Sequence, residues 1–323
     1  MTTVATTRAA IVSVAGAVVG VAIGLQEHGG GDVDQQLHEH TIEHMRAGAG
    51  YYDAMRLALI EKAGQPPANV WTVRPPLPFA LWQLVPPTTL RLVVGVVFFA
   101  MLMGIAMIAR DGQPRDSWLP AAAVALAIPS IVNWSSFLYL HTELWTVPLA
   151  LFGVAALRRR PVLAAALLGT AVVCREMWIP LFVLAALWGV RVGKQVVWPW
   201  LVAGGLAAVA LALHVVWSQR ILDPSGTDAA YLFTWDAFPR VLTPGTSAFA
   251  VVIGLACIVV GGGEAIARRT SDSSAWVTTW FAALTIPLTF WSGRVYWQIL
   301  WVPFIIAFVP AGSLHLWRRL RPA

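Results

Sequence analysis

Residues 143–190 read ELWTVPLALFGVAALRRRPVLAAALLGTAVVCREMWIPLFVLAALWGV, and this stretch decides the class of fold. Its apolar runs are separated by the arginine triplet 158–160 and by Arg175-Glu176. Residues 161–190 fit either one kinked helix or a hairpin of two helices, and only the hairpin keeps the basic clusters at both of its ends on one side of a membrane. Each limb is then roughly 21 Å long at 1.5 Å per residue. Because that is shorter than a bilayer, Arg175-Glu176 is expected to lie recessed within protein or a wet cavity.

The rest of the chain repeats this pattern. Of the 323 residues, 58% are hydrophobic and only 12% are charged, against roughly 25% charged in an average soluble domain. The sequence therefore predicts an all-α integral membrane protein, a single transmembrane domain over residues 1–323 with about ten helices. The first apolar block lacks a small-x-small cleavage site, so we interpret it as a retained helix. The predicted spans are 9–25, 89–109, 118–134, 143–157, 161–174, 177–190, 195–217, 246–266, 275–291 and 295–313.

Charge predicts the orientation of these spans. With a cytoplasmic N-terminus, 13 of the 22 basic residues fall in short inner segments, while 12 of the 16 acidic residues fall outside. This short-loop bias predicts a multi-pass protein of the plasma membrane with both termini in the cytoplasm. It also explains the net charge of +6 without a nucleic-acid partner. The inner basic residues are Arg8, Arg110, Arg115, Arg158, Arg159, Arg160, Arg191, Lys194, Arg268, Arg269, Arg318, Arg319 and Arg321.

Two outer segments are long, namely the first extracytoplasmic loop at 26–88 and a second at 218–245. Within the first, 34–47 and 51–62 carry apolar residues at helical spacing with charges between them. We expect both to form amphipathic helices along the membrane surface. Cys174 and Cys257 lie in separate apolar blocks, which favours neither a disulfide framework nor a metal knuckle.

The first outer loop carries an ordered series of polar and aromatic residues. Asp32 and Asp34 follow three glycines, and carboxylates at a membrane mouth suit a general base or a divalent-cation ligand. His38, Gly48 and the pair Tyr51-Tyr52 come next, before Arg74-Pro75-Pro76-Leu77 leads into the second span. The later outer helix ends contribute His141, Glu143, Arg175-Glu176, Arg294-Val295-Tyr296 and Pro303.

This order resembles the GT-C superfamily of membrane glycosyltransferases, which includes protein O-mannosyltransferases and lipid A aminoarabinose transferases. Their first outer loop carries an early acidic residue, a Tyr or His four residues on, a Gly, an aromatic pair and an Arg/Lys-Pro-Pro-Leu run. An Arg-Glu pair and a late Arg-x-Tyr…Pro follow. The resemblance covers most of the chain, although this chain is shorter than most members and lacks an appended soluble domain, which leaves the acceptor class open.

The resemblance implies a donor sugar carried on a polyprenyl phosphate and a glycan, lipid or protein acceptor. Asp34 would then activate the acceptor hydroxyl on the extracytoplasmic side. The departing phosphate needs cationic stabilisation, for which guanidinium is well suited. The implied binding residues are Arg74, Arg175 and Arg294 for phosphate, with His38, His141, Glu143, Glu176 and Tyr296 around them. Each arginine has a structural interpretation too, as a partner of a carboxylate or an interfacial anchor.

Two patterns bear on metal ions. Asp32-Val33-Asp34 matches the Asp-x-Asp that holds a divalent ion in oligosaccharyltransferase-type members, so Mg²⁺ or Mn²⁺ is the candidate ion, although no cofactor is required by the resemblance. His40 and His44 lie in an H-x-x-E-H pattern typical of one zinc peptidase group, and they would share a helix face. No third zinc ligand is evident downstream, which disfavours zinc chemistry.

Two other classes of function remain open from the sequence. A transporter or lipid flippase would also place charges among apolar helices, although transporters commonly show internal repeats and charges near the midplane. A membrane scaffold would explain the apolar blocks but not the ordered polar series. We therefore favour the glycosyltransferase, with the transporter or flippase as the alternative.

Overall fold

The computed structural model describes residues 4–24, 33–63, 67, 70–111, 113–114, 116–137, 140–192, 197–223, 248–292 and 298–320. For residues 4–5, 19–24, 33–34, 63, 71, 88, 129–137, 191–192, 248–255, 288–292 and 298 it describes the backbone alone. Within these ranges all regular structure is helical.

The helices follow one another as α1 (Val4–Gly24), α2 (Val33–Arg46), α3 (Tyr51–Ala63), α4 (Leu77–Trp82), α5 (Pro87–Arg110), α6 (Leu119–Phe137), α7 (Thr142–Ala156), α8 (Pro161–Cys174), α9 (Ile179–Val192), α10 (Trp198–Ser218), α12 (Ala248–Arg268), α13 (Ser273–Ser292), α14 (Gln298–Ile306) and α15 (Val309–Leu320). Two short 3₁₀ turns lie at Val70–Thr72 and Glu176–Trp178. Each predicted apolar block contains a helix, and the last block is divided between α14 and α15.

Two helices are long and apolar enough to cross a membrane, at Thr89–Arg110 and Trp198–Ser218. A third span results if Ile299–Ile306 and Val309–Leu320, which meet at 45°, count as one. Several other helices are apolar but shorter, among them Thr142–Ala156 and Pro161–Cys174. The structure therefore shows an all-helical chain with two or three candidate membrane spans in the part that it describes, and the ten predicted spans stay a prediction.

The hairpin predicted over 161–190 is present. Pro161 is well placed at the first position of α8, where its missing N–H is no loss. Arg175 ends α8 in an extended conformation, and α9 begins after the 3₁₀ turn. Trp188, near the end of α9, contacts Trp276 in the first turn of α13. The turn before α13 lies at the same end of the bundle as the turn before α8, as described below. The last turns of α9 thus return toward the end of the bundle from which α8 starts.

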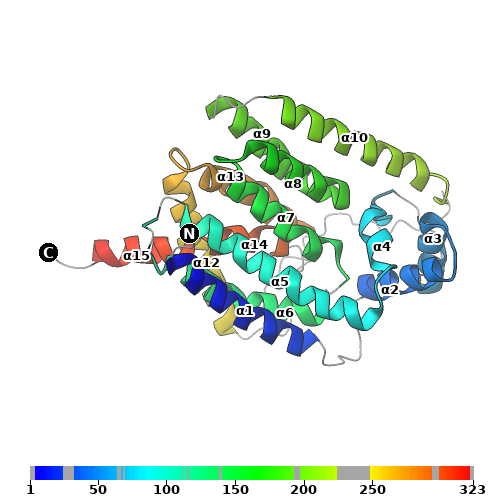
Figure 1. Cartoon of the computed structure of the whole chain (residues 1–323), viewed down its shortest axis with the longest axis horizontal. Helices are drawn as coiled ribbons and strands as arrows, with labels where there is room; N and C mark the ends of the chain where they lie inside the picture. The colour runs from blue at the N-terminus through cyan, green and yellow to red at the C-terminus, as the bar shows by residue number, and fades with distance from the viewer. Residues whose placement is uncertain are drawn as a thin grey trace.

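The helices form a bundle (Figure 1). Helices α1, α5 and α6 pack together on one side, and α7 lies between α5 and α8. Helix α10 runs along the opposite side on α8 and is largely exposed. Helices α2, α3 and α4 lie at one end of the long axis, and α15 projects from the other.

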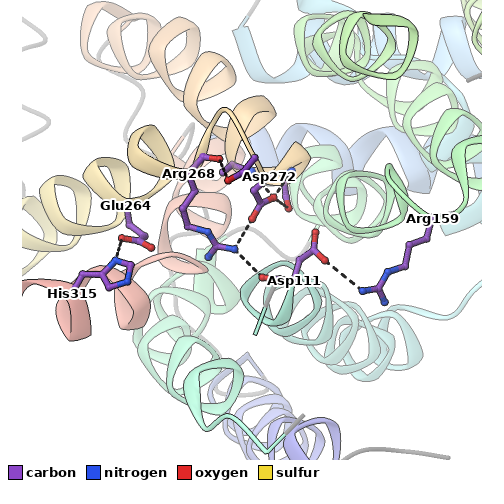
Figure 2. A network of polar contacts seen from close by, with 9 residues as sticks. Asp111, Arg159, Glu264, Arg268, Asp272 and His315 are labelled. Carbon is purple, nitrogen blue, oxygen red and sulfur yellow. Dashed lines mark hydrogen bonds and ion pairs between the residues drawn. The ribbon is translucent and has the colours of Figure 1, made fainter. Parts of the chain in front are cut away.

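Four of the predicted inner segments, at 110–117, 158–160, 267–274 and after 313, meet at the α15 end, which we call the basic end (Figure 2). The side chains of the segment 191–194 lie outside the described part of the structure. Arg268 donates to the Asp111 carbonyl at 2.8 Å and to the Asp272 carboxylate at 2.6 Å. Arg159 lies 3.6 Å from the Asp111 carboxylate. His315 contacts Glu264 at 2.8 Å. These contacts join the ends of α5, α7, α12 and α15, so segments that the charge pattern assigned to one side do share one end of the bundle.

The amphipathic helices differ from expectation in what they face. Leu37 and Thr41 of α2 are buried, as are Met55 and Ala58 of α3, and the Thr41 hydroxyl lies 3.7 Å from the Met55 sulfur. The two helices therefore pack their apolar faces inside the protein instead of laying them on a membrane. Gly48 turns the chain between them with φ of +102°, a conformation that favours glycine.

The glycine run in α12 yields a stability prediction. A Cβ on Gly261 would lie 2.6 Å from the Ile305 carbonyl oxygen of α14, whereas a Cβ on Gly262 would meet nothing within 4 Å. Gly261→Ala should therefore lower the free energy of unfolding by about 1–3 kcal/mol, the usual cost of overpacking. Gly262→Ala should leave it unchanged or raise it by up to about 1 kcal/mol, because alanine favours helix. Thermal unfolding of the purified chain in detergent compares the two, and equal effects would contradict the packing described here.

Candidate functional site

The centre of the candidate site is the Arg175 guanidinium. Its Nε donates to Glu143 Oε1 at 2.8 Å, and Nη2 lies 2.7 Å from the same oxygen. Its Nη1 donates to Glu176 Oε1 at 2.5 Å. The side chains of Arg175 and Glu143 are 3% and 2% exposed, while that of Glu176 is 19% exposed. One arginine thus holds a deeply buried carboxylate and a partly exposed one.

Glu143 is placed by the start of α7. It lies in the first turn of that helix, where the positive end of the helix dipole favours an anion. The Thr142 hydroxyl donates to Glu143 Oε2 at 3.1 Å. Arg74 and His141 also interact electrostatically with Glu143. A charge in an apolar bundle is costly unless it is paired and hydrogen-bonded, and Glu143 has both kinds of partner.

Two buried histidines adjoin this ion pair. The Nδ1–H of His38 donates to the Leu140 carbonyl at 2.8 Å, which ties α2 to the segment that precedes α7. In the neutral ring this leaves Nε2 as an acceptor. The rings of His38 and His141 lie 5.7 Å apart, and the His38 ring also contacts the edge of Phe79 at 5.1 Å. His38 and His141 are each 1% exposed, so they support the site from beneath its surface.

The segment before Pro75-Pro76 is held by both tyrosines. The Tyr51 hydroxyl donates to the Arg74 carbonyl, and the Tyr52 hydroxyl lies 3.1 Å from His214 Nδ1. His214 Nε2–H in turn donates to the Val73 carbonyl at 3.1 Å. Burial raises the pKa of Tyr51 well above its ordinary value, Tyr52 and Glu176 raise it further, and Arg74 opposes them. Tyr51 therefore stays protonated and keeps its donor at Arg74.

The structure brings together six of the predicted binding residues. They come from α2, from the segment before Pro75, from the start of α7 and from the α8–α9 turn, and they are His38, Arg74, His141, Glu143, Arg175 and Glu176. Asp34 is the second residue of α2, one helical turn before His38. Its side chain lies outside the described part of the structure, as do Asp32, Arg294 and Tyr296.

The geometry changes what we expect of Arg175. We predicted that it would bind the donor phosphate, but three of its nitrogens already contact carboxylates. It is therefore placed to orient Glu143 and Glu176. Glu176 and Arg74, which are both partly exposed, are the members of the group that can reach a bound molecule.

His214 was missed by the sequence interpretation. It lies within an apolar block, in the last turns of α10, where an ionisable residue is rare and has a partner or a role. That position was the available signal. Trp178 was assigned to no site either. Its indole N–H donates to the Thr146 hydroxyl at 2.7 Å and fixes the turn directly after Arg175-Glu176.

The zinc-like pattern has another partner. His40 and His44 share one face of α2, and their rings contact the two oxygens of Glu61 on α3 at 3.0 Å each. These hydrogen bonds, first from His44 and then from His40, lower the pKa of Glu61. Among the side chains that the structure describes, no group of three or more His, Cys, Asp or Glu is placed to hold a metal ion.

Comparison with known proteins identifies no relative of the chain, so a function has to be inferred from the geometry of the site. The chain matches no protein-family model, no characterised protein and no solved structure.

Proposed function

We propose that the chain is a multi-pass membrane glycosyltransferase that takes a sugar from a polyprenyl-phosphate donor. The observation that carries this proposal is the meeting of Arg74, Glu143, Arg175 and Glu176 at one end of an apolar bundle. Burying ionisable groups among apolar helices costs free energy, so their presence there suggests a functional site. Here they come from segments spread over about a hundred residues, beside the α2 helix that carries Asp34.

The separation of charges supports a site on the extracytoplasmic face. The basic end joins α5, α7, α12 and α15 through Asp111, Arg159, Arg268 and His315. The candidate site lies where α7 begins and α8 ends, at the opposite end of those helices. A cytoplasmic basic end, as short-loop charge bias favours, would leave the candidate site outside. Nucleotide sugars are absent there, which favours a lipid-linked donor.

The proposed reaction is a displacement at the anomeric carbon. Asp34 accepts the proton of the acceptor hydroxyl, the hydroxyl oxygen forms a bond to the anomeric carbon, and the bond from that carbon to the phosphate oxygen breaks. The lipid phosphate leaves with the electron pair. Arg74 and Arg294 stabilise the charge that develops on it, as guanidinium donors do for phosphate. A divalent ion at Asp32 and Asp34 would supply further positive charge there.

Arg175 and Glu143 have a positioning role in this proposal. Their ion pair is buried, so it holds the α8–α9 turn against α7 without touching a substrate. It sets the direction of Glu176, whose second oxygen is available to orient the acceptor hydroxyl or the Arg74 guanidinium. In this proposal Arg175 and Glu143 hold the site in place, and Glu176 contacts the bound molecule.

Asp34→Asn tests the proposed base. Incubation of the purified chain with a radiolabelled polyprenyl-phosphate sugar and membrane acceptors should show the label leaving the organic-soluble lipid fraction. The variant should slow this release on the order of 10²–10⁴-fold, the usual contribution of a general base.

Asp53→Asn is the matched control for Asp34→Asn, because Asp53 is an exposed carboxylate in the first turn of α3 at the same end of the molecule. It should release label at the wild-type rate. Undiminished release in Asp34→Asn would remove Asp34 from the chemistry. Vectorial movement of the intact labelled donor across a vesicle membrane would indicate the flippase instead.

The two glutamates that flank Arg175 should respond differently to substitution. Glu143→Gln leaves the buried guanidinium without its main partner, so the free energy of unfolding should fall by about 3–5 kcal/mol. Glu176→Gln removes a partly exposed charge and should change thermal unfolding much less, while sugar transfer falls. Thermal unfolding and transfer rates measured on both variants check this. If transfer in Glu176→Gln is intact, then Glu176 does not face the substrate.

A further inference from the structure

The last turns of α15 stand clear of the bundle. Val309 to Gly312 are buried against α12, whereas Leu316, Trp317 and Leu320 are 50%, 56% and 70% exposed. Figure 1 shows this helix projecting from the basic end. Its axis departs from that of α14 by 45°. The end of this helix therefore presents apolar surface away from the bundle, at Leu316 and Leu320 in particular.

The exposed residues of α15 divide into two faces. Successive helical residues are about 100° apart, so Leu316, Leu320 and Trp317 share one arc and Arg318 lies on the opposite one. Arg319 flanks the apolar arc, and both arginines are exposed. This combination of an apolar face with Trp and Leu and a basic polar face is typical of helices that lie in a membrane interface.

The surroundings of α15 add to its positive charge. Arg158, Arg160 and Arg269 are exposed at the same end, and three of the nearby acids already have partners. Asp272 accepts from Arg268, Asp111 contacts Arg159, and Glu264 is buried with one oxygen on His315. The charge that remains exposed there is predominantly positive, with Asp116 as an exposed acid among the arginines. The His315–Glu264 contact also fixes the direction in which α15 leaves α12, as Figure 2 shows.

We propose that the exposed end of α15, with the arginines of the basic end, binds the headgroups of anionic phospholipids. The phosphates would contact Arg318 and Arg319, and Trp317 and Leu320 would enter the boundary between headgroups and acyl chains. A nucleic acid would satisfy the arginines but would leave the aliphatic residues beside them uncovered, so a lipid surface is the better match. The inference does not depend on sugar transfer.

Lipid retention by the full chain tests this surface. The chain is purified in a neutral detergent, mixed with equal amounts of phosphatidylglycerol and phosphatidylcholine, isolated again, and its bound lipid is measured by mass spectrometry without any donor sugar. The wild type should retain phosphatidylglycerol preferentially. Arg318→Gln/Arg319→Gln should lower that preference on the order of 25-fold, because each cation at an anionic surface contributes about fivefold.

The matched control is Arg56→Gln/Lys62→Gln, which removes two cations from α3 at the opposite end of the molecule. It should keep the wild-type preference. Trp317→Ser/Leu320→Ser should lower retention of both lipids alike, as loss of an apolar contact would. A wild type without preference, or a preference that survives Arg318→Gln/Arg319→Gln, would overturn the proposal. So would arginine-dependent binding of single-stranded RNA by a chain that does not discriminate between the lipids.

Discussion

The ion pair between Arg175 and Glu143 is the interaction on which the arrangement of the site depends. It joins the end of α8 to the start of α7, with both side chains almost fully buried. Two opposite charges in an apolar bundle are tolerated only when each has its partner, so the pair fixes how these helices meet. Glu176, Arg74 and the two histidines then take their places around it.

Hydrogen bonds between buried polar groups extend outward from the ion pair. His38 ties α2 to the Leu140 carbonyl, and Tyr51 ties α3 to the Arg74 carbonyl. His214 joins Val73 to α10, a helix that otherwise has little cover. The hydrogen bonds that satisfy the site are therefore also the ones that attach the peripheral helices to the bundle. A proposed catalytic centre built this way would be rigid before a substrate arrives.

The two ends of the bundle divide the chain's polar residues by kind. At one end carboxylates and histidines surround a single buried guanidinium. At the other, Asp111 and Asp272 contact Arg159 and Arg268, Glu264 contacts His315, and most of the other exposed charged side chains that the structure describes are arginines. The first end is suited to chemistry on a polar molecule beside a membrane. The second is suited to holding the chain against an anionic surface.

The sequence alone determined the helical class, the position of each apolar block and the hairpin at Arg175. The length of an apolar run and the placement of charges at its ends are local properties that can be read directly from the sequence. The sequence also indicated five residues of the candidate site, namely His38, His141, Glu143, Arg175 and Glu176. Only the tertiary structure decided that α2 and α3 bury their apolar faces against each other, that Arg175 is already occupied by two carboxylates, and that His214 supports Val73. These depend on which helices become neighbours across as many as 141 positions of sequence. Which helices become neighbours is set by how their side chains pack in three dimensions, and a local sequence pattern contains no information on that packing.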